Sequence, residues 1–339
     1  MQEALFYDVI DIDSATVQCH LCCHRCTIKN GKTGLCKVRL NTNGILHSLV
    51  YGKLVSENVD PIEKKPLFHV SPGSQSYSIA TVGCNFKCRH CQNYQISQFP
   101  IASPEAVPGK SQTPRQVVDN AIAQSCQSIS YTYVEPTIFF EFAYDTAEIA
   151  HQHHLKNIFV SNGYTGPEAA KKIAPFLDAN NIDLKAFNDT FYRQICKAKL
   201  APVLDTITLM KELGVWVEVT TLIIPGLNDS DKELDKIAKF LVGLDAEIPW
   251  HVSRFYPTYK LTNHPPTPVE TLHRARAIGK AAGLKYIYTG NVHDQGGEDT
   301  ICPQCSKTLV KRAGYTIQEN LMANDTCPNC NTPIAGIWT

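Results

Sequence analysis

Residues 81–93 read Thr-Val-Gly-Cys-Asn-Phe-Lys-Cys-Arg-His-Cys-Gln-Asn, and their three cysteines are Cys84, Cys88 and Cys91. Three residues separate the first pair, and two separate the second pair. This spacing suits three thiolates that close on three corners of a cubic iron–sulfur cluster, whose complete ligation takes four. One iron would then lack a protein ligand, and an open metal position is where a catalytic site binds a small molecule.

The same spacing is compatible with a zinc site or with a chance grouping of cysteines. The residues that follow favour a catalytic cluster, because the loop stands at the start of a regular alternation of strands and helices.

The composition indicates a globular chain of balanced charge. Its 339 residues allow one large or two ordinary domains, and 43% hydrophobic residues supply a core. Lys+Arg and Asp+Glu both number 32, so the formal net charge is zero. Nucleic-acid-binding proteins usually carry a basic excess, so we expect no such partner. No stretch approaches the roughly 18 consecutive apolar residues of a membrane span, so we expect no membrane association.

Cysteine is abundant, with 14 residues, and 12 of them fall into three groups. C-x-x-C spacings in a chain without a secretion signal indicate metal sites rather than disulfides. Residues 1–17 are acidic and lack the apolar core of a signal peptide. We therefore expect a reducing compartment, the cytoplasm.

The first cysteine group lies near the N-terminus. One natural ligand set is Cys19, Cys22, Cys26 and Cys36. Cys23 is then left over, although spacing alone does not decide between Cys22 and Cys23. Four thiolates can close a structural zinc site or hold a fully ligated iron–sulfur cluster. We expect His20 and His24 to lie beside the thiolates rather than to ligate the metal.

The last cysteine group forms two C-P-x-C motifs near the C-terminus. Its members are Cys302, Cys305, Cys327 and Cys330. Paired motifs of this kind are typical of a structural metal site, and zinc is the favoured ion. A rubredoxin-like iron site is the alternative, and it would indicate electron delivery rather than a structural role.

Between these groups, strand-like and helix-like segments alternate. The predicted strands are 77–82, 129–134, 157–161, 182–186, 215–223, 250–256 and 286–289. One predicted helix begins at Thr113-Pro114. The other predicted helices cover 139–150, 167–177, 202–213, 229–244 and 268–282. Such alternation predicts βα units on a parallel sheet. Six or seven units are fewer than the eight of a closed barrel, so we expect a partial, open (β/α)6-type barrel.

Polar residues fall where the predicted strands end. Cys84 follows the first strand, Glu135 the second and Ser161-Asn162-Gly163 the third, while Asp183 and Lys185 lie near the end of the fourth. Active-site groups of such barrels sit at the carboxyl ends of the strands. We therefore expect these side chains to share one site.

We divide the chain into three parts. Residues 1–76 form an N-terminal cysteine-rich module with connecting strands, residues 77–295 the partial barrel, and residues 296–339 a zinc-ribbon-like or rubredoxin-like module.

Several motifs resemble the radical S-adenosylmethionine (SAM) core of pyruvate formate-lyase-activating enzymes and their relatives. They are residues 83–93, Tyr133-Val134-Glu135-Pro136-Thr137, Ser161-Asn162-Gly163-Tyr164, Asp183-Leu184-Lys185 and Pro225-Gly226-Leu227-Asn228-Asp229. With the cysteine modules at both ends, the whole chain is most similar to the radical SAM enzymes of the AmmeMemoRadiSam system. The resemblance implies that a [4Fe-4S] cluster cleaves SAM to a 5′-deoxyadenosyl radical, which abstracts hydrogen from a substrate.

The resemblance also implies roles for individual residues. Cys84, Cys88 and Cys91 would ligate the cluster. Glu135 stands where the family contacts the SAM amino group, although Tyr133 and Val134 replace two glycines of that motif. Asn162 matches a position near the ribose or methionine part of SAM. Lys185, with Asp183, matches a motif whose lysine is a partner for the SAM carboxylate, and His90 matches a position near the adenine.

The resemblance implies partners as well: a low-potential electron donor such as flavodoxin or ferredoxin, and Memo-like and AMMECR-like proteins. One alternative function is activation of a glycyl-radical enzyme by abstraction from a glycine of a partner protein. We favour another substrate, because the simplest activases lack the flanking cysteine modules. A second alternative is a non-catalytic metal-binding scaffold, against which the three-thiolate loop argues.

Two residues of the predicted sixth strand, His251 and Arg254, could face the barrel interior. Either could contact a substrate, or each could be a buried polar residue with partners inside the core.

Overall fold

The computed structural model describes residues 1–292, 296–322 and 324–338. Its centre is a sheet in the order β16-β15-β14-β13-β12-β11-β9-β8. The strands are β8 (Ser56–Pro61), β9 (Gln75–Ala80), β11 (Ser128–Tyr131), β12 (Lys156–Ser161), β13 (Ala179–Asp183), β14 (Trp216–Ile223), β15 (Trp250–Arg254) and β16 (Ile287–Gly290). From β9 to β16 every pairing is parallel, and β8 joins β9 antiparallel. The edge strands β8 and β16 do not pair, so the predicted open barrel is confirmed.

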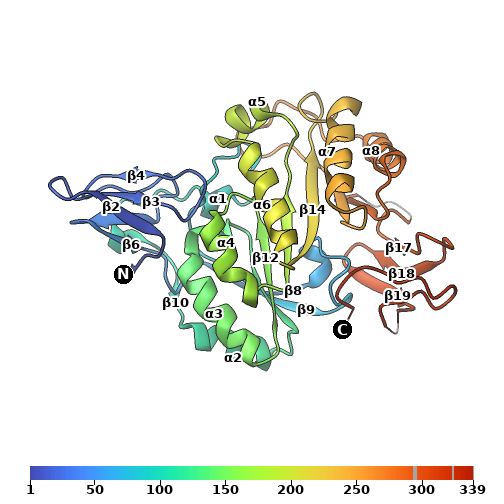
Figure 1. The fold of residues 1–339 in the computed structure, drawn as a ribbon, viewed down its shortest axis with the longest axis horizontal. Coiled ribbons are helices and arrows are strands. Elements are labelled where there is room, and N and C mark those ends of the chain that lie inside the picture. The colour runs from blue at the N-terminus through green and yellow to red at the C-terminus, as the bar shows by residue number, and fades with distance from the viewer. Residues whose placement is uncertain (293–295, 323, 339) are drawn as a thin grey trace.

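Helices cover the outer face of this sheet (Figure 1). The longer ones are α2 (Pro114–Ala123), α3 (Phe140–Gln152), α4 (Pro167–Ile173), α6 (Ala201–Glu212), α7 (Asp231–Leu244) and α8 (Val269–Ala282). Shorter turns are α1 (Tyr94–Ser97), α5 (Asp189–Phe191), a π-helical turn (Tyr192–Cys196) and 3-10 turns at Ile62–Lys64, Pro104–Ala106, Pro136–Phe139 and Ala174–Phe176.

Local sequence explains where several helices begin and end. Thr113 caps α2 in a capping box with Gln116, each side chain bonding the other's backbone N–H. Ser230 caps α7 by accepting from the Glu233 N–H. Gly283 ends α8 with a φ of +111°, a conformation that glycine adopts at little cost.

Small antiparallel sheets lie at opposite ends of the molecule (Figure 1). Near the N-terminus, β2 (Tyr7–Asp11), β3 (Thr16–Cys19) and β4 (Thr27–Ile28) form one sheet, and β1 (Gln2–Glu3), β6 (Ile45–Ser48) and β5 (Arg39–Thr42) form another. β7 (Lys53–Leu54) pairs with β10 (Lys110–Ser111). Near the C-terminus lie β17 (Thr300–Ile301), β18 (Thr308–Ala313) and β19 (Thr316–Asn320).

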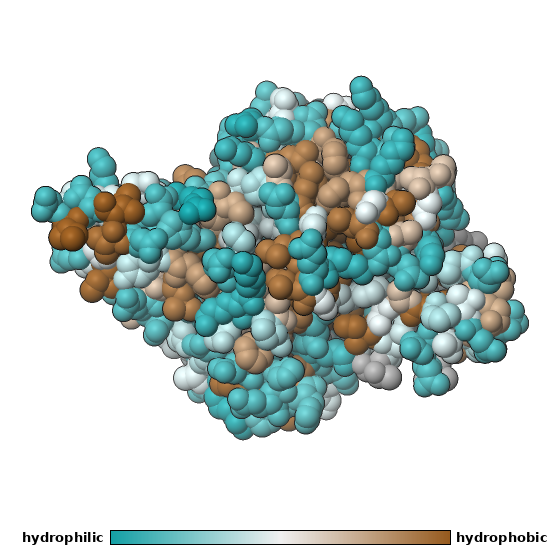
Figure 2. Space-filling view, in the orientation of Figure 1, coloured by the Kyte–Doolittle hydropathy of each residue, from teal (hydrophilic) through white to brown (hydrophobic). Residues whose placement is uncertain are grey.

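The N-terminal hairpin carries exposed apolar side chains at its tip, visible as brown atoms in Figure 2. They are Val9, Ile10 and Ile12. No helix in the described part of the chain is long and apolar enough to span a membrane.

One predicted strand is misplaced. We expected residues 182–186, whereas β13 covers Ala179–Asp183. Its first residues include two buried asparagines, and polar residues weaken the apolar signal of a strand. Asn181 nevertheless has partners, because it donates to the Pro66 carbonyl at 2.7 Å and accepts from the Thr220 hydroxyl at 2.9 Å. Lys185 therefore lies beyond the strand end.

A buried polar network joins the C-terminal module to the barrel. His69 contacts the Ala335 carbonyl through Nδ1 and the Tyr288 hydroxyl through Nε2, both at 2.6 Å. Arg312 donates to the Phe68 carbonyl at 2.8 Å and lies over the Phe68 ring. Glu218, on β14, accepts from the backbone N–H groups of Phe68 and His69. Residues from four distant parts of the sequence thus hold this junction.

The network predicts an acid-sensitive fold. Burial lowers the pKa of His69 to about 4, with Glu218 opposing the shift and Arg312 reinforcing it. The unfolded histidine, with its ordinary pKa near 6.5, binds its proton first as pH falls. This contribution to stability is therefore complete above pH 6.5 and is lost as pH falls toward 4. Between pH 7 and 5, we expect a loss of about 2 kcal/mol of unfolding free energy that His69→Gln abolishes, measured by urea denaturation. An equal pH slope in both proteins would contradict this assignment.

Candidate active site

The cysteine loop leaves the end of β9 and is fixed by neighbouring backbone. Gly83 has a φ of +96°, and a Cβ there would lie 2.6 Å from Val38 and 2.9 Å from the Cys36 carbonyl oxygen. Only glycine fits this approach. Lys87 N–H donates to the Cys196 carbonyl at 2.9 Å, and Arg89 N–H donates to the Ile195 carbonyl at 3.0 Å. The π-helical turn therefore supports the loop from behind.

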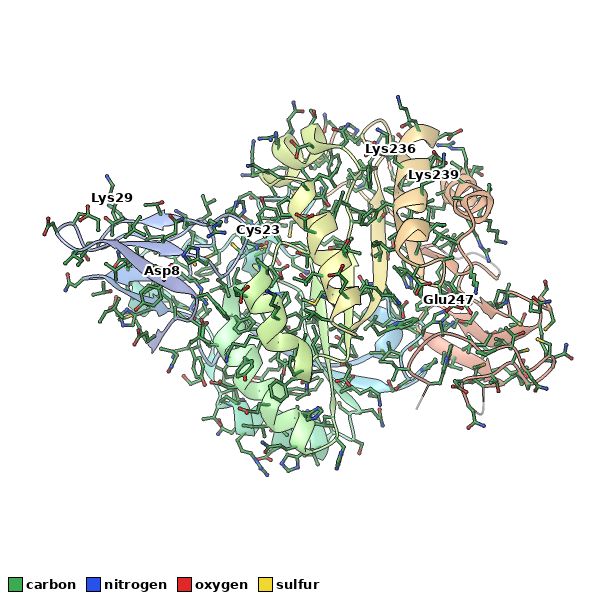
Figure 3. The ribbon with its side chains drawn as sticks, in the orientation of Figure 1. Asp8, Cys23, Lys29, Lys236, Lys239 and Glu247 are labelled. Atoms are coloured by element: carbon green, nitrogen blue, oxygen red, sulfur yellow. The ribbon has the colours of Figure 1, made fainter. Side chains whose placement is uncertain are left out.

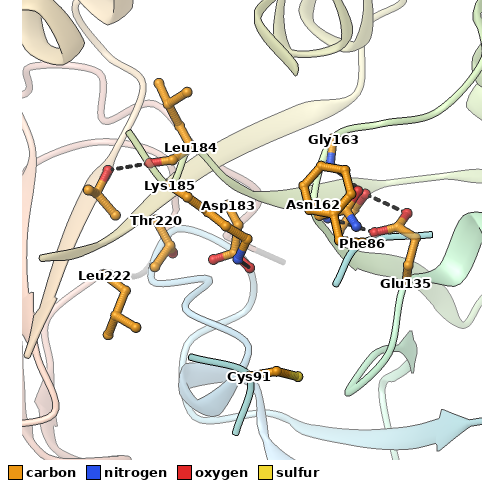
Figure 4. Close-up of polar contacts among 12 residues, drawn as sticks. Phe86, Cys91, Glu135, Asn162, Gly163, Asp183, Leu184, Lys185, Thr220 and Leu222 are labelled. Atoms are coloured by element: carbon orange, nitrogen blue, oxygen red, sulfur yellow. Dashed lines mark hydrogen bonds and ion pairs between the residues drawn. The ribbon is translucent and has the colours of Figure 1, made fainter. Parts of the chain in front are cut away.

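The loop opens into a cavity of about 510 Å³ at the carboxyl ends of the parallel strands. Every residue that we predicted for this site lines it: Cys84, Cys88, His90, Cys91, Glu135, Asn162, Asp183 and Lys185. Figure 4 shows several of these side chains around a shared space, with Cys91 facing the others across it. The parallel register brings together residues that are up to a hundred positions apart in sequence.

The three thiols lie in a largely buried environment. Burial raises the pKa of Cys84 and of Cys91, and the Ser97 hydroxyl, 3.2 Å from the Cys91 sulfur, partly offsets the latter. A hydrogen bond with the Cys196 thiol, together with burial, raises the pKa of Cys88 well above its ordinary value. Cys196 stood alone in the sequence, and only the fold places it beside Cys88.

Glu135 organises the loops around the cavity. One carboxylate oxygen accepts from the Thr137 hydroxyl at 2.6 Å and from the Ser161 hydroxyl at 2.9 Å, and the other accepts from the Asn162 N–H at 2.7 Å. It also caps the turn that begins at Pro136. Burial raises the pKa of Glu135, and these donors oppose the shift. The carboxylate thus positions Asn162 (Figure 4).

Asp183 and Lys185 form an ion pair, with Nζ and Oδ2 2.8 Å apart. Burial opposes the charge of Lys185, but Asp183 and the neighbouring thiols raise its pKa well above the ordinary value. The backbone N–H of Lys185 donates to the Tyr192 hydroxyl at 3.0 Å, and its carbonyl accepts from Asn228 at 2.7 Å. A lysine held in this way presents a fixed positive charge to the cavity.

His90 is 5% exposed, and its Nδ1 has no partner among the described residues. Burial lowers the pKa of His90 to about 3, so the ring is neutral at pH 7. A buried polar atom without a partner is costly, and a ligand that fills the cavity can satisfy it. Three thiols, a fixed ammonium group and an unpaired ring nitrogen fit an iron–sulfur cluster with a small polar cosubstrate.

Tyr133 takes the place of a family glycine but keeps a glycine-like backbone, with a φ of +61°. Such a conformation costs a non-glycine residue roughly 1–2 kcal/mol. The Tyr133 hydroxyl bonds Asp60, its ring lies 4.9 Å from the Lys65 ammonium, and its carbonyl accepts from Asn93 at 2.8 Å. These contacts hold the strained residue and tie the cysteine loop to β11.

Other parts of the chain also contribute to the cavity wall. Glu63, Lys64 and Phe68 come from the segment between β8 and β9, and Glu298 and Tyr315 come from the C-terminal module. This contribution was not predicted, because no local pattern marks a residue as lining a distant cavity.

His251 and Arg254 differ in whether they line the cavity. His251 lines the cavity but is 3% exposed, and its Nε2 lies 2.6 Å from Glu218. It is therefore a buried polar residue with a partner. Arg254 does not line the cavity, and its guanidinium stacks on Tyr256.

The C-terminal cysteines form a compact group with the geometry of a tetrahedral metal site. Their four sulfur atoms lie within 4.8 Å of one another, with Cys302–Cys330 and Cys305–Cys327 at 3.6 and 3.7 Å. Tetrahedral Zn–S bonds of about 2.3 Å separate neighbouring sulfurs by about 3.8 Å, so this group fits a tetrahedral ion. The Lys307 backbone N–H and other donors lower the pKa of Cys305 to about 6, which favours the thiolate.

The N-terminal cysteines also meet. Cys19, Cys22, Cys26 and Cys36 line one small cavity, whereas Cys23 donates its S–H to the Thr165 carbonyl at 3.2 Å. Figure 3 shows Cys23 at the boundary between the N-terminal strands and the helices of the barrel. The structure thus separates Cys22 from Cys23, which sequence spacing left undecided.

Comparison with known proteins places the chain in a superfamily. The family model for the radical SAM superfamily matches residues 78–241. An uncharacterized protein of Methanocaldococcus jannaschii, MJ0808, is 49% identical over 313 residues, which are 92% of this chain and 92% of that protein. The chain belongs to the radical SAM superfamily, whose core binds SAM and a [4Fe-4S] cluster.

More distant relatives are informative about the fold. A second M. jannaschii protein, MJ1632, named provisionally as a glycyl-radical enzyme activating enzyme, is 24% identical over 218 residues, 63% of this chain and 79% of that protein. The crystal structure of Streptococcus suis SuiB bound to S-adenosylmethionine superposes with a TM-score of 0.52 at 11% identity. That match covers 68% of this chain and 53% of SuiB, and it shows a shared fold.

The C-terminal site predicts a measurable metal stoichiometry. We expect Cys330→Ser to lose about one Co²⁺ equivalent in titrations of the metal-free protein, because a tetrahedral site needs all four thiolates. Absorption bands of tetrahedral cobalt thiolate report the loss. The matched control is Cys126→Ser, which removes a buried cysteine outside all three groups and should leave the stoichiometry unchanged. Equal cobalt binding by Cys330→Ser and wild type would contradict the site.

Proposed function

We propose that this chain is a radical SAM enzyme that abstracts hydrogen from a substrate bound in the 510 Å³ cavity. The observation that carries the proposal is the convergence of Cys84, Cys88 and Cys91 with Asn162 and Lys185 on one cavity. No structural role requires three thiols on one loop beside a fixed cation.

Each residue would have a distinct part. Cys84, Cys88 and Cys91 would hold a [4Fe-4S] cluster, which when bound supplies the electron that cleaves SAM to methionine and the 5′-deoxyadenosyl radical. Lys185 would pair with the SAM carboxylate, and Asp183 would keep the lysine protonated and oriented. The Asn162 amide and the neutral His90 ring would contact the nucleoside part. Glu135 would face the SAM ammonium while holding Asn162 in place.

The cavity volume of about 510 Å³ favours a substrate of limited size. Glu63, Phe68 and Tyr315 line the same cavity as the loop cysteines. They come from the segment before β9 and from the C-terminal module, so parts of the chain on both sides of the barrel sequence contribute to the cavity wall. A substrate would then enter as a small molecule or a narrow segment.

Activation of a glycyl-radical enzyme is the second candidate. The similarity to MJ1632 supports it, but that match leaves about a third of this chain unpaired. The AmmeMemoRadiSam resemblance instead supports Memo-like and AMMECR-like proteins as partners, with a flavodoxin or ferredoxin as electron donor.

The first prediction of this proposal concerns SAM cleavage. With dithionite and without oxygen, the reconstituted wild type should form 5′-deoxyadenosine, and Cys88→Ala should form at least 100-fold less, because two thiolates do not hold the cluster. Liquid chromatography of the nucleoside products measures both. Equal amounts of product from the two proteins would contradict the assignment of the cluster to this loop.

A second prediction concerns SAM binding. Charge-assisted hydrogen bonds contribute about 1.5–3 kcal/mol, so Lys185→Gln should weaken SAM binding roughly 10- to 100-fold in equilibrium dialysis. Lys64→Gln is the matched control, because Lys64 also lines the cavity but its ammonium is paired with Asp60 at 2.7 Å. We expect its SAM affinity to stay within about twofold of wild type. Loss of affinity in the control alone would contradict the role that we propose for Lys185.

A further inference from the structure

The four N-terminal thiols that share a cavity differ from the C-terminal four in their spacing. Among the residues that the structure describes, the C-terminal group is the one whose ligand atoms all lie within 4.8 Å of one another. Cys19, Cys22, Cys26 and Cys36 surround a common cavity, but their sulfur atoms do not all lie within 4.8 Å of one another. Four thiolates on a single tetrahedral zinc ion have sulfur–sulfur distances of about 3.8 Å. Four thiolates on a cubic cluster have longer sulfur–sulfur distances, because each thiolate bonds a different iron.

Two buried donors without partners line the same cavity. Asn85 is 2% exposed and Arg39 is 1% exposed. The Asn85 Nδ2 and the Arg39 Nε have no hydrogen-bond acceptor in the described part of the chain. The other two guanidinium nitrogens of Arg39 donate to the Leu5 carbonyl and to the Glu141 carboxylate. Inorganic sulfide and cysteine sulfur accept such N–H bonds in iron–sulfur proteins, and a bare zinc ion adds no acceptor.

This cavity adjoins the cysteine loop of the active site. Asn85 lines the N-terminal cavity, and its side-chain oxygen lies 3.8 Å from the Cys84 sulfur. The same oxygen accepts from the Asn162 amide at 2.8 Å. Behind it, the Cys36 carbonyl lies against Gly83, where no Cβ fits. Asn85 therefore lies between the N-terminal cavity and the Cys84 thiol.

We propose that Cys19, Cys22, Cys26 and Cys36 hold a second iron–sulfur cluster that passes one electron to the cluster at Cys84, Cys88 and Cys91. Four protein ligands leave no open iron, so electron transfer rather than substrate binding is the role that this site can fill. The electron would come from a low-potential flavin or iron–sulfur carrier protein. One carrier is oxidised and the N-terminal cluster is reduced, and that cluster then reduces its neighbour. The destination of the electron rests on the proposed function, whereas the cluster itself does not.

The presence of the cluster is tested by metal content. In the variant with Cys84, Cys88 and Cys91 all changed to Ala, anaerobic reconstitution should leave about four iron and four sulfide per chain. Adding Cys22→Ser to that variant should remove most of this iron. Adding Cys23→Ser instead should not, because Cys23 lies outside the cavity. Electron paramagnetic resonance of the reduced protein identifies the cluster.

Two outcomes of that experiment would overturn the proposal. The first is a loop variant that holds zinc at both terminal sites and no iron. The second is equal iron loss in the Cys22→Ser and Cys23→Ser proteins. Neither measurement uses SAM or activity, so a failed radical reaction would leave the result interpretable.

The relay is tested by comparing two reductants. In a chain that keeps the loop cysteines but carries Cys22→Ser and Cys26→Ser, dithionite should still support 5′-deoxyadenosine formation at near the wild-type rate. Reduced flavodoxin should support it at least tenfold more slowly than in wild type. Equal rates with flavodoxin in both proteins would overturn the relay. Loss of the dithionite reaction as well would also overturn it, because the site would then be needed for more than electron delivery.

Discussion

Parallel pairing of β9 with β11, and of each strand with the next through β16, is the constraint on which the site depends. Parallel strands end at one edge of a sheet, so the segments after β9, β11, β12 and β13 converge there. Cys84, Glu135, Asn162 and Lys185 each belong to a different segment. These four residues are far apart in sequence and meet only in the folded chain. Their cavity exists because the sheet holds one register, and Glu135 then joins two of the loops through its bonds to Thr137, Ser161 and Asn162.

Buried polar groups hold the terminal parts of the chain against this barrel. Glu218 accepts from the backbone of Phe68 and His69, and Arg312 reaches the Phe68 carbonyl from the C-terminal module. At the other end, Arg39 pairs with Glu141 at the start of α3. Such groups are costly to bury without partners, which makes these junctions specific in geometry. Since the segment around Phe68 also lines the cavity, the junction shapes the space where a substrate would lie.

The two terminal cysteine groups have identical ligand atoms but different geometries. One closes to tetrahedral spacing on a small sheet, with its sulfurs 3.6 and 3.7 Å apart in two pairs. The other stays wider, surrounds a cavity with unpaired donors, and adjoins the active-site loop through Asn85. Thiolate softness does not distinguish zinc from iron–sulfur clusters. The spacing of the sulfurs and the neighbouring donors carry that information.

The sequence by itself determined the kind of fold and most of the candidate site. Helix caps such as Thr113 and Ser230, and apolar strands between them, are local signals, so the βα alternation and the open barrel followed from them. The cysteine loop and the motif residues at strand ends were visible for the same reason. The start of β13 was misplaced because its buried asparagines weaken the apolar signal of a strand, and Asn181 finds its partners only in the folded chain.

Tertiary structure alone decided which distant groups meet. It placed Cys196 beside Cys88, separated Cys22 from Cys23, and brought Tyr315 to the wall of the cavity. It also holds Tyr133 in a left-handed backbone conformation, through contacts with Asp60 and Asn93. Each of these depends on contacts between segments far apart in the chain. Periodicity and spacing describe a segment's own conformation, and they hold no information about which other segment will pack against it.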